Sequence, residues 1–149
     1  MATYTGLQSG RAIHGTDCCG NTWRDSNQVT PPAALTTSDD LVLLSVPAGM
    51  RLETLRFRAG DFDTGTTLTA NIGYRTRLPV GSATNLTYFA AASTALQAST
   101  LTAWQELVFA PVKFDEPVDI VLIPAANATG VSGTPSIYVQ GEAAVVGIS

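Results

Sequence analysis

From residue 41 onward, apolar residues recur in short runs that end at turn-forming residues. Leu41 to Val46 is a continuous apolar run, and Pro47-Ala48-Gly49 stops it. Regular alternation of apolar and polar residues, in a stretch rich in Thr, Val, Leu and Ile, is typical of β-strands with one buried face. The predicted strands are Leu41 to Val46, Met50 to Phe57, Leu68 to Tyr74, Ala103 to Phe109, Val118 to Ile123 and Ile137 to Val146. About six to eight strands predict an all-β fold, an antiparallel β-sandwich of jelly-roll-like form.

One of these strands changes the face that carries its apolar residues. Met50 and Leu52 share one parity, whereas Leu55 and Phe57 share the other. Because side chains alternate between the two faces of a strand, an extra residue is needed to keep both pairs inside. The sequence therefore predicts a β-bulge or a bend near Glu53-Thr54.

Residues 1–40 show no sustained period of two or of 3.6, and glycines and the pair Pro31-Pro32 interrupt them. We expect an extended, irregular N-terminal arm at 1–40, followed by one β-sandwich domain at 41–149. The arm carries large apolar groups that are unfavourable to leave in water. They lie either on the protein's own domain or on a neighbouring subunit. The candidate partner contacts are Tyr4, Leu7, Ile13, Trp23 and Arg24.

An acidic loop, Gly60-Asp61-Phe62-Asp63-Thr64-Gly65, joins two of the predicted strands. Its glycines permit positive φ, and Asp side chains accept hydrogen bonds from the backbone of a turn. We therefore expect Gly60, Asp61, Asp63 and Gly65 to form a structural turn. Calcium is the alternative, but an EF-hand loop needs further oxygen ligands and a Glu at its twelfth position. No metal is expected.

The stretch from Leu78 to Thr102 is the hardest to interpret. Its first part has the composition of a loop, and Phe89, Ser93 and Leu96 follow in an alanine-rich segment. Alanine favours helix, so we expect one or two helical turns at Phe89 to Leu96.

Composition limits the classes of function. Charged residues are 13% of the 149-residue chain and hydrophobic residues 45%, a balance that suggests surface hidden against other chains. The net charge of −4 argues against direct binding of nucleic acid, which needs a clustered positive field. No apolar run reaches the ~18 residues of a membrane span, and the start lacks the layout of a secretion signal. We expect neither membrane nor nucleic acid as a partner.

Reactive side chains are scarce. Cys18 and Cys19 are adjacent, which is unsuitable for a disulfide framework, and we expect reduced thiols. His14 is the single histidine, and with Asp17 and the two cysteines it leaves a tetrahedral metal site incomplete. A catalytic triad and a phosphate-binding glycine loop are both missing from the sequence pattern. We expect no enzyme activity and no cofactor.

Three segments carry a family resemblance. They are PAGMRLETLRFRAGDFDTGTTLTANIGYRTR, YFAAASTALQAS and PVDIVLIPAANATGVSGTPSIYVQGEA, within roughly Val46 to Ala143. They resemble small virion proteins of tailed bacteriophages, in particular head decoration (cement) proteins with a jelly-roll-like domain. The resemblance implies a homo-oligomer, dimer or trimer, that is assembled in the host bacterial cytoplasm and sits on the capsid exterior. There it would brace neighbouring major capsid protein subunits.

Other functions stay open. Phage β-sandwiches also serve as tail, fibre and head-completion parts. A carbohydrate-binding module would use exposed aromatic residues on a sandwich face, and a depolymerase or lysin fragment would be the enzymatic alternative. The spacing of the available aromatic residues predicts no cluster. They are Trp23, Tyr74, Tyr88, Trp104 and Tyr138.

Overall fold

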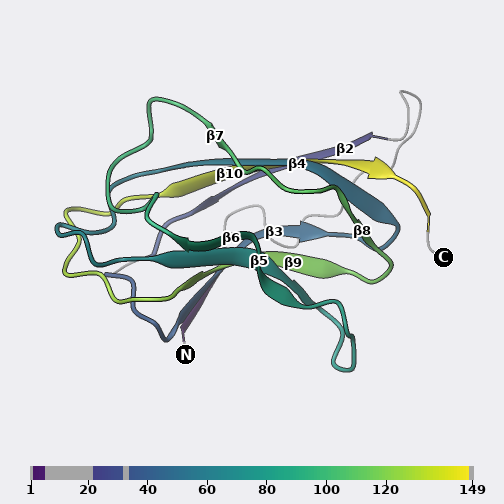
Figure 1. Cartoon of the computed structure of the whole chain (residues 1–149), viewed down its shortest axis with the longest axis horizontal. Coiled ribbons are helices and arrows are strands. Elements are labelled where there is room, and N and C mark those ends of the chain that lie inside the picture. The colour runs from purple at the N-terminus through teal and green to yellow at the C-terminus, as the bar shows by residue number, and fades with distance from the viewer. Residues whose placement is uncertain (1, 6–21, 32–33, 148–149) are drawn as a thin grey trace.

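The computed structural model describes residues 2–5, 22–31 and 34–147, and it shows two packed β-sheets (Figure 1). One sheet, sheet A, has the strand order β1-β3-β9-β5-β6, and the other, sheet B, has β2-β10-β4-β7, with β8 also paired to β4. The strands are β1 (Ala2–Thr5), β2 (Thr22–Val29), β3 (Asp39–Val46), β4 (Met50–Ala59), β5 (Ala70–Thr76), β6 (Asn85–Ser93), β7 (Gln105–Glu106), β8 (Val112–Phe114), β9 (Val118–Pro124) and β10 (Ile137–Val145).

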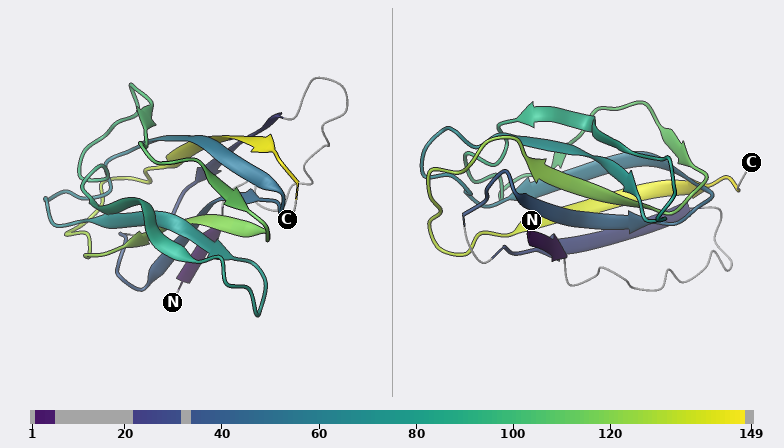
Figure 2. Two further views of the ribbon diagram at one scale, coloured as in Figure 1. Left: turned by 45° about the vertical axis from the view of Figure 1, so that its right-hand side comes forward. Right: turned by 90° about the horizontal axis from the view of Figure 1, so that it is seen from below.

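The connectivity is that of a jelly roll. The chain passes between the sheets from β2 to β3, to β4 and to β5, and later from β8 to β9 and to β10. This gives two four-strand layers, β3-β9-β5-β6 and β2-β10-β4 with β7 and β8 sharing the last place. β1 is an addition, paired parallel to β3 at the edge of sheet A (Figure 2). The predicted all-β, jelly-roll-like fold is confirmed.

The core lies between the two sheets. The inward residues of β4, and those of β10 from Ile137 to Ala143, pack against those of β3 and β9 and are buried, while Val145 at the end of β10 is partly buried. Along β10 these core residues alternate with residues that point to the outer face of sheet B. The even-numbered residues from Tyr138 to Ala144 are half-buried. The described part of the chain contains no helix with the length and apolarity needed to cross a bilayer.

The predicted change of face in β4 is confirmed as a β-bulge. Glu142 of β10 lies opposite Thr54, but the next residue, Ala143, lies opposite Leu52, so Glu53 has no opposing residue. Met50 and Leu52 before the bulge, and Leu55 and Phe57 after it, are all buried. The bulge places Arg56 and Arg58 on the outer face.

The expected arm at 1–40 is wrong for the described part of that stretch. Thr22–Val29 is the edge strand β2 of sheet B, and Ala2–Thr5 is β1. Trp23 and Val29 point into the core, Trp23 being only 4% exposed. Asn27, on the same face, is buried as well, and its Nδ2 donates to the Leu43 carbonyl 2.8 Å away in the other sheet. A polar residue at an inward position hides the period of two that predicts a strand.

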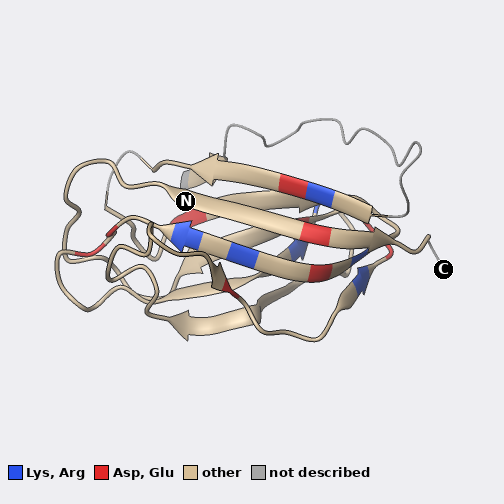
Figure 3. Cartoon of the chain, turned by 90° about the horizontal axis from the view of Figure 1, so that it is seen from above, with Lys and Arg blue, Asp and Glu red and all other residues tan. Residues whose placement is uncertain are grey.

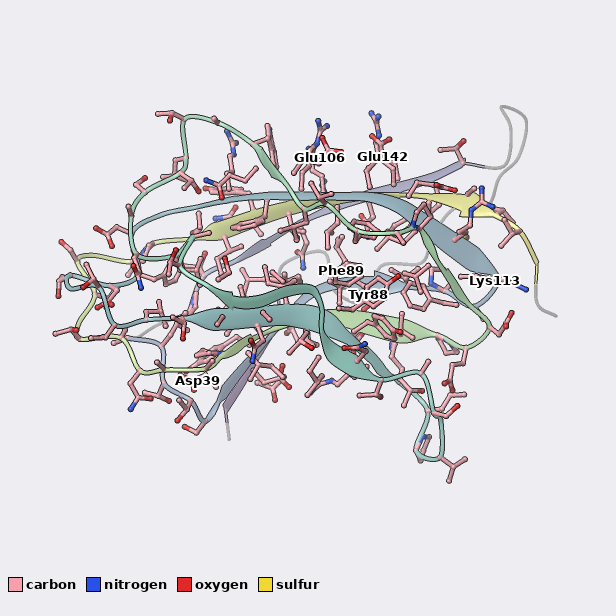
Figure 4. The ribbon with its side chains drawn as sticks, in the orientation of Figure 1. Asp39, Tyr88, Phe89, Glu106, Lys113 and Glu142 are labelled. Carbon is pink, nitrogen blue, oxygen red and sulfur yellow. The ribbon has the colours of Figure 1, made fainter. Side chains whose placement is uncertain are left out.

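The helical turns expected at Phe89 to Leu96 are also wrong, because Asn85–Ser93 forms strand β6. Its pairing with β5 is irregular: Ile72 lies opposite Ala90, but Tyr74 lies opposite Asn85. The looped-out residues bring Tyr88 and Phe89 between the layers (Figure 4), where they meet Tyr74 and Phe109. Edge-to-face contacts of these rings close this side of the sandwich.

The predicted strand at Ala103 to Phe109 is much shorter in the structure. Only Gln105–Glu106 pairs with β4, and the next strand, Val112–Phe114, lies between two of the strands predicted from the sequence and is not one of them. The two short strands pair with different parts of β4, and the segment before them returns to β4 at Thr100, whose N–H bonds to the Ala59 carbonyl. That segment carries Trp104.

Candidate interaction surface on the outer face of sheet B

The outer face of sheet B presents charged and amide side chains in ordered rows. Figure 3 shows that charged residues gather on three neighbouring strands of this face. In one row Tyr138 of β10 lies between Gln28 of β2 and Arg58 of β4. In the next row Gln140 lies between Ser26 and Arg56, with Glu106 beyond Arg56. Residues that lie opposite each other on neighbouring strands point to the same face and have their Cβ atoms close together, so each row brings its side chains side by side.

Arg58 is held between two aromatic rings. Its guanidinium carbon lies 4.9 Å from the centre of the Trp104 ring and 5.0 Å from that of Tyr138. Arg56 lies 5.5 Å from the same Trp104 ring, and its Nε donates to Gln140 Oε1 at 2.9 Å. Contact with ring faces orients the planar guanidinium while leaving its edge available for hydrogen bonds.

The segment before Trp104 is fixed to the end of β4. Thr100 donates its backbone N–H to the Ala59 carbonyl at 2.8 Å, and its Oγ1 accepts the Ala59 N–H at 2.9 Å. The Leu101 carbonyl accepts a hydrogen bond from Arg58 Nη1 at 3.4 Å. These bonds place Trp104 over the two arginines, although the ring and Arg58 are far apart in the sequence.

Beside this cluster the face is hollowed. The hollow has a volume of about 230 Å³. Aromatic, amide, hydroxyl and cationic groups line it, and no carboxylate does. The lining residues are Ser26, Asn27, Gln28, Arg58, Trp104, Tyr138, Val139 and Gln140.

The charges of this face are not all paired. In the described residues, five cationic side chains have an acidic partner: Arg24, Arg51, Arg75, Arg77 and Lys113. Arg56 and Arg58 are the described cations without one. In addition, Arg58 Nε is buried with no hydrogen-bond partner. A buried donor that lacks an acceptor costs free energy, so the cluster is not arranged for maximal stability alone.

The acidic loop has the opposite character, because the Asp63 carboxylate is surrounded by donors. Its Oδ2 accepts the backbone N–H groups of Thr67 and Leu68 at 2.8 and 2.7 Å. Its Oδ1 accepts those of Gly65 and Thr129 at 3.1 and 2.7 Å. Asp63 is 1% exposed and joins its own loop, residues 65–68, to the distant Thr129. Asp61 makes one comparable contact, from its Oδ1 to the Asp63 N–H at 3.0 Å.

These bonds shift the acidity of Asp63. The Leu68 N–H contributes most, burial opposes it, and the bonds from Thr129, Gly65 and Thr67 add to it, so the pKa of Asp63 falls well below its ordinary value of 3.8. No group of three potential metal-binding side chains occurs among the described residues. Since backbone donors already occupy both Asp63 oxygens, a cation would have to displace them.

The glycines of this loop act differently from expectation. Neither Gly60 nor Gly65 has positive φ. Instead, other segments approach them closely: a Cβ on Gly60 would lie 2.6 Å from Pro135 Cβ, and one on Gly65 would lie 2.6 Å from Thr129 Oγ1. The loop needs glycine for space rather than for backbone conformation.

The predicted partner contacts do not form one surface in the described structure. Trp23 belongs to the protein's own core, which is the alternative that the sequence left open. Tyr4 is half-buried against the core, and Arg24 is exposed and paired with Glu142. Figure 4 shows Glu142 and Glu106 pointing away from sheet A. Leu7 and Ile13, like His14, Asp17, Cys18 and Cys19, lie outside the described residues.

The Arg58 cluster was missed at the sequence level. The parity of Ile137 to Val146 already places Tyr138 and Gln140 on the outer face, and the predicted bulge places Arg56 and Arg58 there too. What the sequence does not show is that β4 and β10 are neighbours and that Trp104 covers them. Both facts depend on how the folded chain arranges its strands and loops.

Two solved structures share the fold. A chain of the cyanophage Pam1 capsid asymmetric unit matches with a TM-score of 0.67 and 21% identity, over 93% of this chain and 94% of that one. A chain of the capsid of Ralstonia phage GP4 matches with a TM-score of 0.66 and 22% identity, over 99% and 100%. No protein-family model and no curated protein matches the sequence.

At this level of identity, the likeness establishes the fold. The high coverage in both directions means that each matching chain has nearly the same length as this one and contains the same single β-sandwich. The class shown is therefore a small jelly-roll β-sandwich, a fold shared with one chain in each of these two phage capsids.

Proposed function

We propose that this chain is a non-enzymatic decoration, or cement, protein of a tailed-phage head. In this proposal it binds the outer surface of the capsid as a dimer or trimer, after assembly in the host cytoplasm, and braces neighbouring major capsid protein subunits. The observation that carries the proposal is the whole-chain fold match to two chains from phage capsids. The sequence resemblance to decoration proteins is an independent support.

A projecting hairpin supplies a candidate contact with the capsid. The connection between β5 and β6 extends beyond the sandwich (Figure 1). It carries Val80, which is 95% exposed, and Leu78 and Leu86 are exposed on the same hairpin. Large apolar side chains at the end of a projecting loop have little to pack against in the isolated chain. They would be buried on a partner, where such contacts dominate the free energy of binding.

The proposed mechanism is thermodynamic linkage between binding of this protein and stability of the capsid lattice. A protein that binds the expanded lattice and not its disrupted form stabilises that lattice by mass action, by about 2.7 kcal/mol per site at a hundredfold excess over the Kd. Tyr4 remains a second candidate contact, and so do Leu7 and Ile13 outside the described residues.

The test uses phage heads that lack the protein. The purified chain should bind them at a fixed number of copies and raise their disruption temperature. Val80→Asp should reduce the bound copies at least tenfold while the chain keeps its melting temperature. Val108→Asp is the matched control, because Val108 is also 95% exposed but lies between β7 and β8 beside the other sheet.

Two outcomes would reject the proposal. If the folded chain does not bind heads at any concentration, the head role is wrong, and tail or fibre assembly becomes the next candidate. If both valine variants bind fully, the hairpin is not the contact. Sedimentation of the free chain tests the oligomeric state separately.

A further inference from the structure

The hollow beside Arg58 is not needed for capsid binding through the hairpin, and it has its own chemistry. We propose that it is a binding site for an acidic sugar residue of a polysaccharide, such as a hexuronic acid. Arg58, with Arg56 beside it, would bind the carboxylate. Trp104 and Tyr138 would contact the sugar ring, and the amides of Gln28 and Gln140 would bind hydroxyl groups.

The charges around the hollow favour an anionic ligand. Arg56 and Arg58 are the described cations without an acidic partner, and no carboxylate lines the hollow. Arg56 also faces Glu106 and Glu142 on its other side, across a second, smaller depression. Arg58 is therefore the principal cation of the hollow. A guanidinium fixed between two rings loses little further freedom when it binds a carboxylate in two-point geometry.

The remaining lining favours a sugar over a peptide. Gln28, Gln140 and Ser26 offer amide and hydroxyl groups, which match the vicinal hydroxyls of a sugar. Gln28 Nε2 is 3.1 Å from Ser136 Oγ and Gln140 Oε1 accepts from Arg56, so both amides are oriented before a ligand arrives. The hollow crosses the outer face of β2, β10 and β4, whereas a peptide that adds to a sheet pairs along one strand edge.

Size limits the ligand. At about 230 Å³ the hollow is smaller than the ~300–1,000 Å³ sites that enclose drug-sized molecules. It fits a single ring with its carboxylate, held at an open surface. Weak binding of one residue would be multiplied when several copies of the chain stand on one particle and meet one polymer.

The experiment is a titration of the full chain with three probes: a short oligogalacturonate, a neutral oligoglucose of the same length and a hexaglutamate peptide. Binding is followed by the perturbation of the Trp104 and Tyr138 NMR signals. We expect saturable binding of the oligogalacturonate, with the neutral sugar at least tenfold weaker. We expect no saturation by the peptide.

Variants locate the site. Arg58→Gln and Trp104→Ala should each weaken oligogalacturonate binding at least tenfold. Arg51→Gln is the control, because Arg51 is on the same strand and outer face but pairs with Glu53 at 2.6 Å. Far-ultraviolet circular dichroism of each variant reports folding. If Trp104→Ala unfolds, Gln140→Ala takes its place.

Three results would overturn the assignment. They are no saturable binding of the oligogalacturonate, equal binding of hexaglutamate, and equal losses in Arg51→Gln and Arg58→Gln. The second result would make the hollow a carboxylate site for a protein partner, and the third would reduce the effect to general charge. None of them bears on the capsid test, which uses the β5–β6 hairpin and phage heads.

Discussion

The Asp63 loop and the Arg58 hollow both hold a charged group in place, but only the loop saturates its charged group with hydrogen bonds. Asp63 accepts four backbone N–H groups from two segments, whereas Arg58 lies against two rings, donates one long hydrogen bond to the Leu101 carbonyl and lacks an anion. The difference separates two uses of a charge. A group with all its partners stabilises the fold, and a group that is oriented but unpaired is available to a ligand. Four predictions test this comparison, ordered by the size of the expected effect.

The largest effect should come from Asp63→Asn. Each carboxylate oxygen accepts at least two backbone N–H groups, so either orientation of the new amide points its NH2 group at donors. We expect a large fall in melting temperature in calorimetry. Asp61→Asn is the control, since Asp61 receives one backbone N–H that an amide oxygen can still accept. Equal losses in the two variants would contradict the central role of Asp63.

The second prediction concerns pH. The folded pKa of Asp63 lies below its ordinary value of 3.8, so the unfolded chain binds a proton that the folded chain does not. The stabilisation is complete above about pH 5 and is lost as the pH falls through 3.8 and below. Urea unfolding from pH 6 to pH 2.5 should show this decline. In Asp63→Asn the free energy of unfolding should fall less steeply with pH, by the contribution of one carboxyl group. An unchanged slope in this variant would contradict the prediction.

The third effect should be small, because Arg58 contacts the rest of the fold through the Trp104 and Tyr138 rings and one long hydrogen bond to the Leu101 carbonyl. Cation–π contacts at exposed sites contribute ~0.5–1 kcal/mol each, and removing the unpartnered buried Nε offsets part of that loss. Arg58→Gln should therefore lower the free energy of unfolding by about 1 kcal/mol or less in urea titrations. A loss above ~3 kcal/mol would make Arg58 a structural residue like Asp63.

The smallest effect is expected for Arg24 and Glu142, an ion pair on the same outer face. The Arg24 side chain is 69% exposed, so water and salt screen the attraction. A double-mutant cycle with Arg24→Ala and Glu142→Ala should give a coupling free energy of ~0.2–1 kcal/mol, reduced further at 1 M salt. A larger coupling would show that this face contributes more to stability than its exposure indicates.

The sequence predicts the parts of this fold in which apolar residues alone set the period. The alternation at Leu68 to Tyr74 and the parity change at Glu53-Thr54 both identify strands correctly. Strand β2 escapes detection because the inward Asn27 is polar and its partner, the Leu43 carbonyl, lies in the other sheet. Strand β6 escapes because its residues between Asn85 and Ala90 loop out of register, which removes any regular period.

Of the two charged sites, the sequence predicts one and not the other. The Asp63 turn is local in sequence, so glycine and aspartate spacing predicts its existence, although not the reason for its glycines. The Arg58 hollow depends on the order of strands in sheet B and on a loop that returns over β4. No local pattern contains that information, because Trp104 and Arg58 meet only in the folded chain.

The bulge at Glu53 also governs how this chain can change by small genetic steps. Glu53 is the extra residue, so without it Thr54 and Leu55 would follow Leu52 in regular alternation, with Leu55 and Phe57 still on the core side and Arg56 and Arg58 still on the outer face. Loss of the Glu53 codon therefore keeps both faces of β4, whereas loss of a further codon from the strand would exchange the faces of the residues beyond it. The bulge is a place in β4 where the chain can be shortened by one residue without turning the surface of sheet B into the core.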